Sequence, residues 1–200
     1  MKTKLLMFIC LSALASVGLT VAALTKPDPP PLVKDSRVPL VETVHLATER
    51  FKSVSEAEAA GYAPFHGCVS EPQEGAMGIY FVNDNLVGDG TLDPAQPEVL
   101  LYEFKEGQMR LSAVEYIVIA EAWHADNEAP PVLLGQLLNY IGSPNRYGIP
   151  AYYELHVWAW SHNPMGTFAD WNPGVSCDEY IVEDARPNVS YPRPRLGKPK

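Results

Sequence analysis

The sequence predicts an α+β protein, in which N-terminal helices precede a curved, mainly antiparallel sheet that carries one inserted helix. Apolar residues recur at near-helical spacing between residues 41 and 61, and four separate strand-like runs follow. Strands and helices do not alternate regularly, which disfavours a parallel sheet. With 200 residues, of which 46% are hydrophobic, the chain is long enough for one domain with a buried core.

The first residues have the pattern of a secretory signal peptide. Lys2 and Lys4 precede an apolar run that starts at Leu5, and the small residues at 21–23 fit a cleavage site. We therefore expect residues 1–23 to be removed and the protein to be periplasmic or secreted. Because about 20 apolar residues are also enough to span a bilayer, an uncleaved N-terminal membrane anchor is the alternative.

Proline-rich segments flank the predicted domain on both sides. Many of the 19 prolines lie near the two ends of the chain, where they favour extended backbone that builds no core. We predict a linker over residues 24–40, a single globular domain over residues 41–182, and a disordered, basic tail over residues 183–200.

The predicted mature chain is strongly acidic. The full chain has 15 basic and 24 acidic residues, and removal of Lys2 and Lys4 leaves 13 basic residues and a net charge of −11. Such a charge repels phosphate groups, so nucleic acid and anionic membrane surfaces are disfavoured as partners. Cations, neutral small molecules and basic proteins are compatible partners, and no integral membrane domain is expected once the signal is cleaved.

Two cysteines fall within the predicted domain. In an oxidising compartment Cys68 and Cys177 are expected to form a disulfide. The bond would close a loop of about 110 residues, for which the chain-entropy model gives about 5 kcal/mol as an upper figure. The alternative is a free Cys68 that acts as a nucleophile beside His66.

Local patterns predict the individual elements in order. An apolar stripe at near-helical spacing is predicted from Val41, Val44, Leu46 and Phe51. The helix is expected to break near Ser53, and a second helical piece to end at Gly61. Strands are predicted at residues 78–82, 98–104, 109–120 and 153–161. The apolar run over residues 132–142 predicts the inserted helix, with its last glycine as a stop signal.

The last predicted strand, "YELHVWAWS", carries a row of polar and aromatic side chains. Side chains alternate between the two faces of a strand, so Glu154, His156, Trp158, Trp160 and His162 fall on one face. The other face is apolar and suits a core. The polar row is either a binding site or the ordinary lining of a sheet.

Glutamates also interrupt two of the other apolar strands. Glu103 follows "VLLY", and Glu115 lies in the run "AVEYIV". Burial of an unpaired carboxylate costs several kcal/mol, so each needs a partner, a metal ion or contact with solvent. If they share a face with His156, a concave pocket for a small organic ligand results. The predicted ligand-binding residues are Glu103, Glu115, His156, Trp158, Trp160 and His162.

Three classes of function fit this row. The first is a non-enzymatic module that binds a small organic ligand. The second is a metal-dependent or acid–base hydrolase that uses Glu115 and His156 as base and ligand. The third is a structural or partner-binding protein of the cell envelope. A buried Glu115 with a shifted pKa that faces His156 would favour the first two, and a solvated Glu115 paired with arginine would favour the third.

No familiar catalytic, cofactor or metal motif occurs in the sequence. Glycine-rich phosphate loops, nucleophile elbows, zinc-binding HExxH helices and CxxC pairs are all missing. We therefore name no cofactor and predict no metal site, with His66 and His156 as the candidate ligands if an ion binds. His162 would lie roughly 20 Å from His156 on an extended strand, so the two cannot share an ion.

The segment after this strand, "HNPMGTFADWNPGVSC", is expected to be a structured loop. Its two Asn-Pro steps start turns, and the cysteine at its end anchors it. Loops held in this way often carry binding residues. Asp170, Trp171 and Asn172 are therefore further candidates.

The segments "GYAPFHGCV", "GAMGIYFVN", "PEVLLYE", "VEYIV" and "NRYGIPAYYELHVWAWSHNPMGTFADWNPGVSC" together resemble a group of exported bacterial proteins. The resemblance spans about residues 43–177 and implies one domain with this order of strands. In that group a histidine is expected within a G-x-H-Y-V-N run, at the position of Tyr80 in this chain. If that histidine is a metal ligand in the group, this chain lacks it. The resemblance implies no particular activity.

Overall fold

The computed structural model describes residues 39–180, so the predicted signal peptide, the linker up to residue 38 and the predicted tail lie outside the described residues. The first helix begins at Pro39, and the end of the predicted linker is therefore part of this helix. Proline suits a first helical turn because its missing N–H would have no partner there. Among residues 39–180, no helix is both long and apolar enough to cross a membrane.

The N-terminal helical segment consists of three short pieces. They are α1 (Pro39–Thr48), the 3-10 helix η1 (Glu49–Lys52) and α2 (Val54–Ala59), so the predicted break near Ser53 is confirmed. Leu40 and Val44 are one turn apart on α1, and both are fully buried with Phe51 in the core. Leu46, which the sequence placed in this stripe, is 80% exposed, because it lies two residues after Val44 and so on another side of the helix. Burial of this stripe attaches the helices to the sheet.

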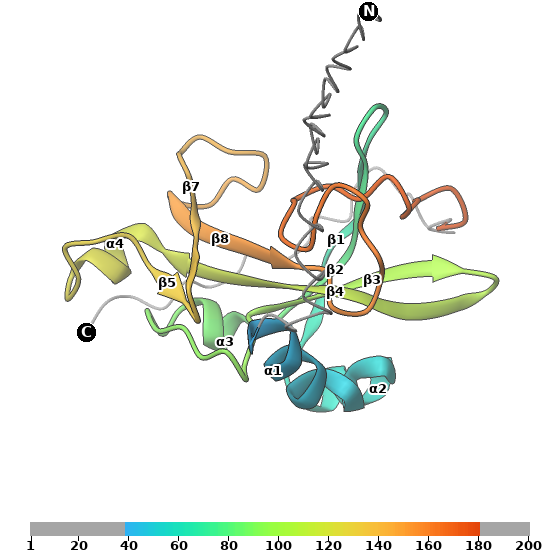
Figure 1. The fold of residues 1–200 in the computed structure, drawn as a ribbon, viewed down its shortest axis with the longest axis horizontal. Helices are drawn as coiled ribbons and strands as arrows, with labels where there is room; N and C mark the ends of the chain where they lie inside the picture. Colours follow the sequence, from blue (N-terminus) through green and yellow to red (C-terminus); the bar gives the residue numbers. More distant parts are fainter. Residues whose placement is uncertain (1–38, 181–200) are drawn as a thin grey trace, which may run out of the picture. The chain divides into compact units, whose positions relative to one another are not determined.

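The sheet contains six strands in the order β1-β2-β3-β4-β8-β7, and every neighbouring pair is antiparallel (Figure 1). The α+β class with a mainly antiparallel sheet is thereby confirmed. Two short helices, α3 (Asp84–Val87) and α4 (Ala120–His124), lie in the connections between strands. The strands are β1 (Ala63–Glu71), β2 (Gly75–Val82), β3 (Val99–Lys105), β4 (Gln108–Ile119), β7 (Asn139–Ile141) and β8 (Tyr152–Val157).

The predicted helix over residues 132–142 is wrong. This segment forms a small hairpin, β5 (Val132–Leu133) and β6 (Gln136–Leu137), followed by β7. Leu134 and Gly135 both have positive φ angles, 45° and 87°, which is the geometry of a two-residue hairpin turn. The apolar residues of this run fit a helical or an extended pattern equally well, and the turn decides between them.

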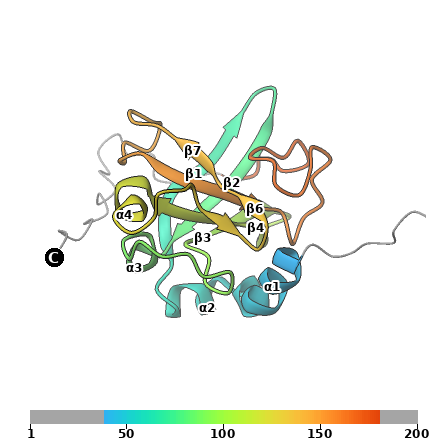
Figure 2. The ribbon, with the colours of Figure 1, turned by 60° about the vertical axis from the view of Figure 1, so that its left-hand side comes forward.

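Both faces of the sheet are buried. Helices α1 and α2 cover one face, and the loop that follows β8 lies on the opposite side (Figures 1 and 2). The helix-covered face holds a core that includes Tyr102, Tyr116 and Leu155. The other face holds a second apolar cluster, which includes Tyr80 and Trp158. Along each strand, every second side chain packs in the first core. The polar side chains between them therefore point into the second cluster instead of into solvent.

Strand β8 ends earlier than the sequence predicts. It stops at Val157, because the next residues turn away: the N–H of Trp158 donates to the Thr167 carbonyl, and the N–H of Trp160 donates to the Ser112 carbonyl. The period-two alternation stops with the strand. Trp158 packs in the second cluster, whereas Trp160 packs against the helix-covered core.

The disulfide between Cys68 and Cys177 is confirmed. The two Cα atoms are 5.6 Å apart, and the bond joins β1 to the end of the loop that follows β8. Cys68 is therefore not a free nucleophile. Cys68 packs against the helix-covered core and Cys177 against the second cluster, so the bond fixes the end of this loop to β1.

Candidate functional site

Strand register places three ionisable side chains side by side on the second face of the sheet. Glu115 on β4 lies directly opposite His156 on β8, and Ile117 lies opposite Glu154. Because residues two apart on a strand point the same way, Glu154 and His156 share a face with Glu115. We call Glu115, Glu154 and His156 the Glu–Glu–His cluster.

The cluster is almost completely inaccessible to solvent. The exposed fractions of Glu115, Glu154 and His156 are 1%, 4% and 0%. One potential donor atom from each of the three lies within 4.8 Å of the others. A buried carboxylate beside an imidazole is the arrangement that the sequence analysis named as favouring a binding or catalytic site.

Three atoms of the cluster have no hydrogen-bond partner. They are Oε2 of Glu115 and both ring nitrogens of His156. Nε2 of His156 is 3.6 Å from Oε2 of Glu115, which is too long for a hydrogen bond. A buried polar atom without a partner costs about 1–3 kcal/mol, so these atoms indicate an interaction that the protein chain alone does not supply.

The electrostatic environment of the cluster is dominated by its own carboxyl groups. Burial raises the pKa of Glu115 well above its usual value, and the neighbouring carboxyl of Glu154 raises it further. Within residues 39–180, no lysine or arginine nitrogen lies within 4.0 Å of either carboxylate. The site therefore brings two carboxyl groups together without a lysine or arginine beside them, and Glu115 is driven to hold a proton.

Tyrosines pack beside the cluster. The hydroxyls of Tyr80 and Tyr147 are 2.9 Å apart, and the Tyr80 hydroxyl also donates to the sulfur of Met77 at 3.0 Å. Burial raises the pKa of Tyr80, and the charge of Glu115 raises it further, so its hydroxyl keeps its proton. Tyr80, at the position where the resemblance implies histidine, is thus a neutral hydrogen-bonding neighbour.

The loop after β8 supplies a further carboxylate. Oδ1 of Asp170 is 3.6 Å from Nδ1 of His156, and the Asp170 side chain is 35% exposed. The loop is fixed close by, because the indole N–H of Trp158 donates to the Ala169 carbonyl at 2.6 Å. The side-chain amide of Asn172 donates to the His162 carbonyl, as the predicted structured loop requires.

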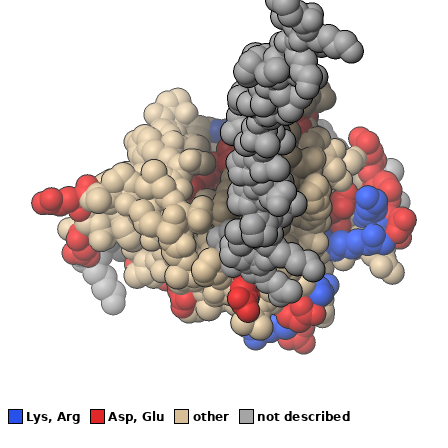
Figure 3. All heavy atoms as spheres, viewed as in Figure 1, with Lys and Arg blue, Asp and Glu red and all other residues tan. Residues whose placement is uncertain are grey.

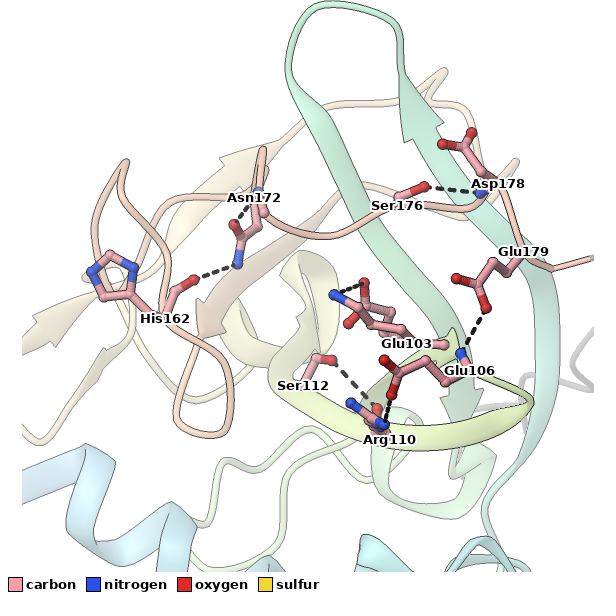
Figure 4. Close-up of polar contacts among 11 residues, drawn as sticks. Glu103, Glu106, Arg110, Ser112, His162, Asn172, Ser176, Asp178 and Glu179 are labelled. Atoms are coloured by element: carbon pink, nitrogen blue, oxygen red, sulfur yellow. Dashed lines mark hydrogen bonds and ion pairs between the residues drawn. The ribbon is translucent and has the colours of Figure 1, made fainter.

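The six predicted ligand-binding residues lie in two different places. Glu115 and His156 are in the buried cluster, and Trp158 belongs to the same apolar cluster of side chains that packs on this face of the sheet. The other three, Glu103, Trp160 and His162, line a separate surface cleft between the β3–β4 hairpin and the loop after β8. In Figure 4 the imidazole of His162 points away from Glu103.

The second metal candidate, His66, is not part of the cluster. It lies half-buried on β1, where its ring contacts Phe65 and Tyr147 at centroid distances of 4.6 and 5.5 Å. Partial burial lowers its pKa. These contacts make His66 part of the aromatic packing at the edge of the second face.

Glu154 was absent from the predicted binding set although it belonged to the same polar row. Its contribution depends on the register of β8 against β4, which no local pattern encodes. Tyr147 was also missed, because it lies in the turn-rich segment between β7 and β8, where no strand pattern predicts its direction. Register brings Glu154 and His156 to Glu115, and the turn brings Tyr147 to Tyr80.

Neither a family model, nor a curated protein, nor a solved structure matches this chain.

Proposed function

We propose that this protein is an exported domain that binds a first-row divalent transition-metal ion at the Glu–Glu–His cluster. The observation that carries the proposal is the convergence of three fully buried donor groups, of which two retain unpartnered atoms. The proposal departs from the sequence analysis, which predicted no metal site and placed a small organic ligand at this row.

The donor set favours a particular group of ions. One imidazole and two carboxylates suit ions such as Zn²⁺, Mn²⁺ and Fe²⁺. Ca²⁺ and Mg²⁺ prefer oxygen ligands alone, and soft ions prefer sulfur. Around a tetrahedral ion with N and O ligands at about 2.0–2.2 Å, ligand atoms lie about 3.4 Å from one another. Nε2 of His156 and Oε2 of Glu115 are 3.6 Å apart, close to this spacing, and all three donor atoms lie within 4.8 Å of one another, so an ion would draw the third ligand inward.

A bound cation would offset the cost of burying two carboxyl groups and unpartnered polar atoms at the site. It would offset the charge of Glu115 and Glu154, and it would take up the unpartnered Oε2 atom and one unpartnered nitrogen of His156. The remaining nitrogen, Nδ1, faces the carboxylate of Asp170. A carboxylate behind a metal-binding histidine is the usual arrangement for fixing its ring and its proton.

Burial favours ion binding over acid–base hydrolysis at this place. A general base must come within hydrogen-bond distance of its substrate, and Glu115 and His156 expose 1% and 0% of their surface. An ion needs only the space between the ligands. The disulfide and the signal-peptide pattern of residues 1–23 support export, because disulfides persist in oxidising compartments.

Elemental analysis and native mass spectrometry of the protein purified from the exported fraction without chelators test this proposal. We expect one ion per chain and its loss on treatment with a chelator. Titration of the chelator-treated protein with Zn²⁺, Mn²⁺ and Co²⁺ then measures affinity, and the visible absorption of bound Co²⁺ reports the ligands.

Two isosteric variants make the test specific. Glu115→Gln removes one charged ligand without opening a cavity, and we expect it to weaken binding by about tenfold or more. Glu98→Gln is the matched control, because Glu98 is also a buried carboxyl, 2% exposed, but lies outside the cluster. A protein that carries no ion and takes up none of the three, or a Glu115→Gln variant with unchanged affinity, would overturn the proposal.

A further inference from the structure

The surface cleft described above has its own chemistry. It measures about 630 Å³, which is the size of a small-molecule site. It lies between the end of the β3–β4 hairpin, the 3-10 helix η1 and the loop after β8. The residues that carry the argument are Lys52, Glu103, Lys105, Arg110, Leu111 and Trp160.

Three cationic side chains converge on the cleft from three elements. Lys52 comes from η1, Lys105 from β3 and Arg110 from β4. The lining contains one acidic residue, Glu103, although the chain as a whole has a net charge of −9. Figure 3 shows Lys and Arg atoms beside Asp and Glu atoms at the end of the protein where this hairpin projects in Figure 1.

The present partners of these cations are weakly held. Lys52 pairs with Glu49 at 2.9 Å, and Lys105 lies 4.0 Å from Glu103. Arg110 pairs with Glu106, whose side chain is 69% exposed (Figure 4). Exposed pairs of this kind contribute little to stability, so an incoming anion can replace the protein's own carboxylates.

An apolar wall stands beside the cations. Leu111 is 6% exposed, and the indole of Trp160 is fixed because its N–H donates to the Thr48 hydroxyl at 3.0 Å. The Lys52 ammonium lies 4.1 Å from the centre of the Trp160 ring. A ligand with an apolar body and a terminal anionic group would contact both parts of the cleft.

We propose that this cleft binds a small organic anion, a carboxylate or a phosphate ester with an apolar body. Arg110 and Lys105 would hold the anionic group, and Leu111 and Trp160 would contact the body. The planar guanidinium of Arg110 matches both kinds of anion. This site is separate from the Glu–Glu–His cluster and does not depend on a metal ion.

NMR titration of the full secreted protein tests this inference with four probes that share a phenyl group. They are phenylacetate, phenyl phosphate, neutral 2-phenylethanol and cationic phenethylamine. The indole N–H signal of Trp160, assigned with Trp160→Phe, reports the cleft. The indole N–H signal of Trp158 is the internal control, because this group donates a hydrogen bond to the Ala169 carbonyl on the other side of the sheet. We expect both anions to shift the Trp160 signal saturably and the amine to leave it unchanged. The anion with the higher affinity shows whether the site prefers a carboxylate or a phosphate.

Charge-changing variants identify the binding groups. Arg110→Gln should weaken binding of the anions by about tenfold, the effect of one charge-assisted hydrogen bond. Arg146→Gln is the matched control, because Arg146 is equally exposed and pairs with Glu71 away from the cleft. Glu103→Gln should tighten binding, since it removes the one negative charge of the lining. Equal binding of the amine, equal effects of the two arginine variants, or no saturable shift with either anion would overturn the inference.

Discussion

The carboxylate of Asp170 and the imidazole of His156 face each other across the boundary between the loop and the sheet, with Oδ1 3.6 Å from Nδ1. The other ring nitrogen, Nε2, lies 3.6 Å from Oε2 of Glu115. The ring therefore lies between a carboxylate that is 35% exposed and a buried one, without a hydrogen bond to either. In this arrangement Asp170 favours a proton on Nδ1 and leaves Nε2 free to bind an ion.

The first prediction concerns Asp170 as a positioning residue. Asp170→Asn keeps the size of the side chain but removes the charge that orients the His156 proton. We expect metal affinity to fall about 10- to 100-fold, which is the usual effect of losing such a partner, while one ion still binds at saturation. Competition with a chelator of known affinity measures both the affinity and the stoichiometry.

Asp178→Asn is the control for this variant. Asp178 is exposed in the same C-terminal segment and takes no part in the cluster. A loss of stoichiometry with Asp170→Asn would make Asp170 a direct ligand, and an unchanged affinity would leave it without a positioning role.

The second prediction concerns the disulfide that holds the loop. The bond joins residues 109 positions apart and fixes the segment that carries Asp170. We expect the double variant Cys68→Ser/Cys177→Ser to lose about 2–5 kcal/mol of unfolding free energy, as is typical for a native disulfide. Its metal affinity should fall as well, because the carboxylate behind His156 is no longer held. Urea unfolding and metal titration measure the two effects.

Reductant supplies the control for the disulfide. A reducing agent should destabilise the wild-type protein and leave the double variant unchanged, because that variant has no bond to lose. Equal stability of wild-type and double variant would show that packing of the loop, and not the bond, holds Asp170 in place.

Regular strands made part of the site predictable from sequence. Glu115 and His156 lie in long apolar runs, and period-two alternation predicts which neighbours share a face within each strand. That the two strands present these residues on the same face was a condition of the predicted pocket, and the register of β4 against β8 meets it. Glu103 has the same parity on β3 as residues that pack on this face, but it pairs with Arg110 near the hairpin end and lies in the surface cleft. Parity gives the face of a residue, and only register gives its distance from another.

Alternation failed where the backbone leaves the sheet. Trp160 and His162 were placed in the row because the strand was extended past Val157, but hydrogen bonds to Ser112 and Thr167 end it there. These contacts join residues 48 and 9 positions apart, which a local pattern does not encode. This turn separates Trp160 and His162 from the buried cluster, and the register of β3 against β4 separates Glu103 from it.

The last prediction concerns the buried carboxyl of Glu98. Burial, helped by the charges of Asp89 and Asp93, raises its pKa to about 8, although a hydrogen bond from the N–H of Ile117 to Oε2 opposes the shift. The folded state therefore keeps a proton that the unfolded state, with the usual value of 4.5, releases. Between these two values, unfolding free energy should fall by up to about 1.4 kcal/mol per pH unit as pH rises.

Glu98→Gln isolates this effect, because glutamine resembles the protonated acid and still accepts the hydrogen bond from Ile117. We would measure urea unfolding at pH 5, 6, 7 and 8, with a chelator present to remove any metal contribution. The unfolding free energy of the variant should increase relative to that of wild type at each step. Other carboxyl groups titrate in both proteins and cancel to first order in the difference, except that Glu115 loses the small upward effect of the Glu98 charge on its pKa. Glu121→Gln, at an exposed position on α4, should stay parallel to wild type. A constant difference between Glu98→Gln and wild type over this range would mean that Glu98 is ionised in the folded protein and that its hydrogen bond outweighs the cost of burial.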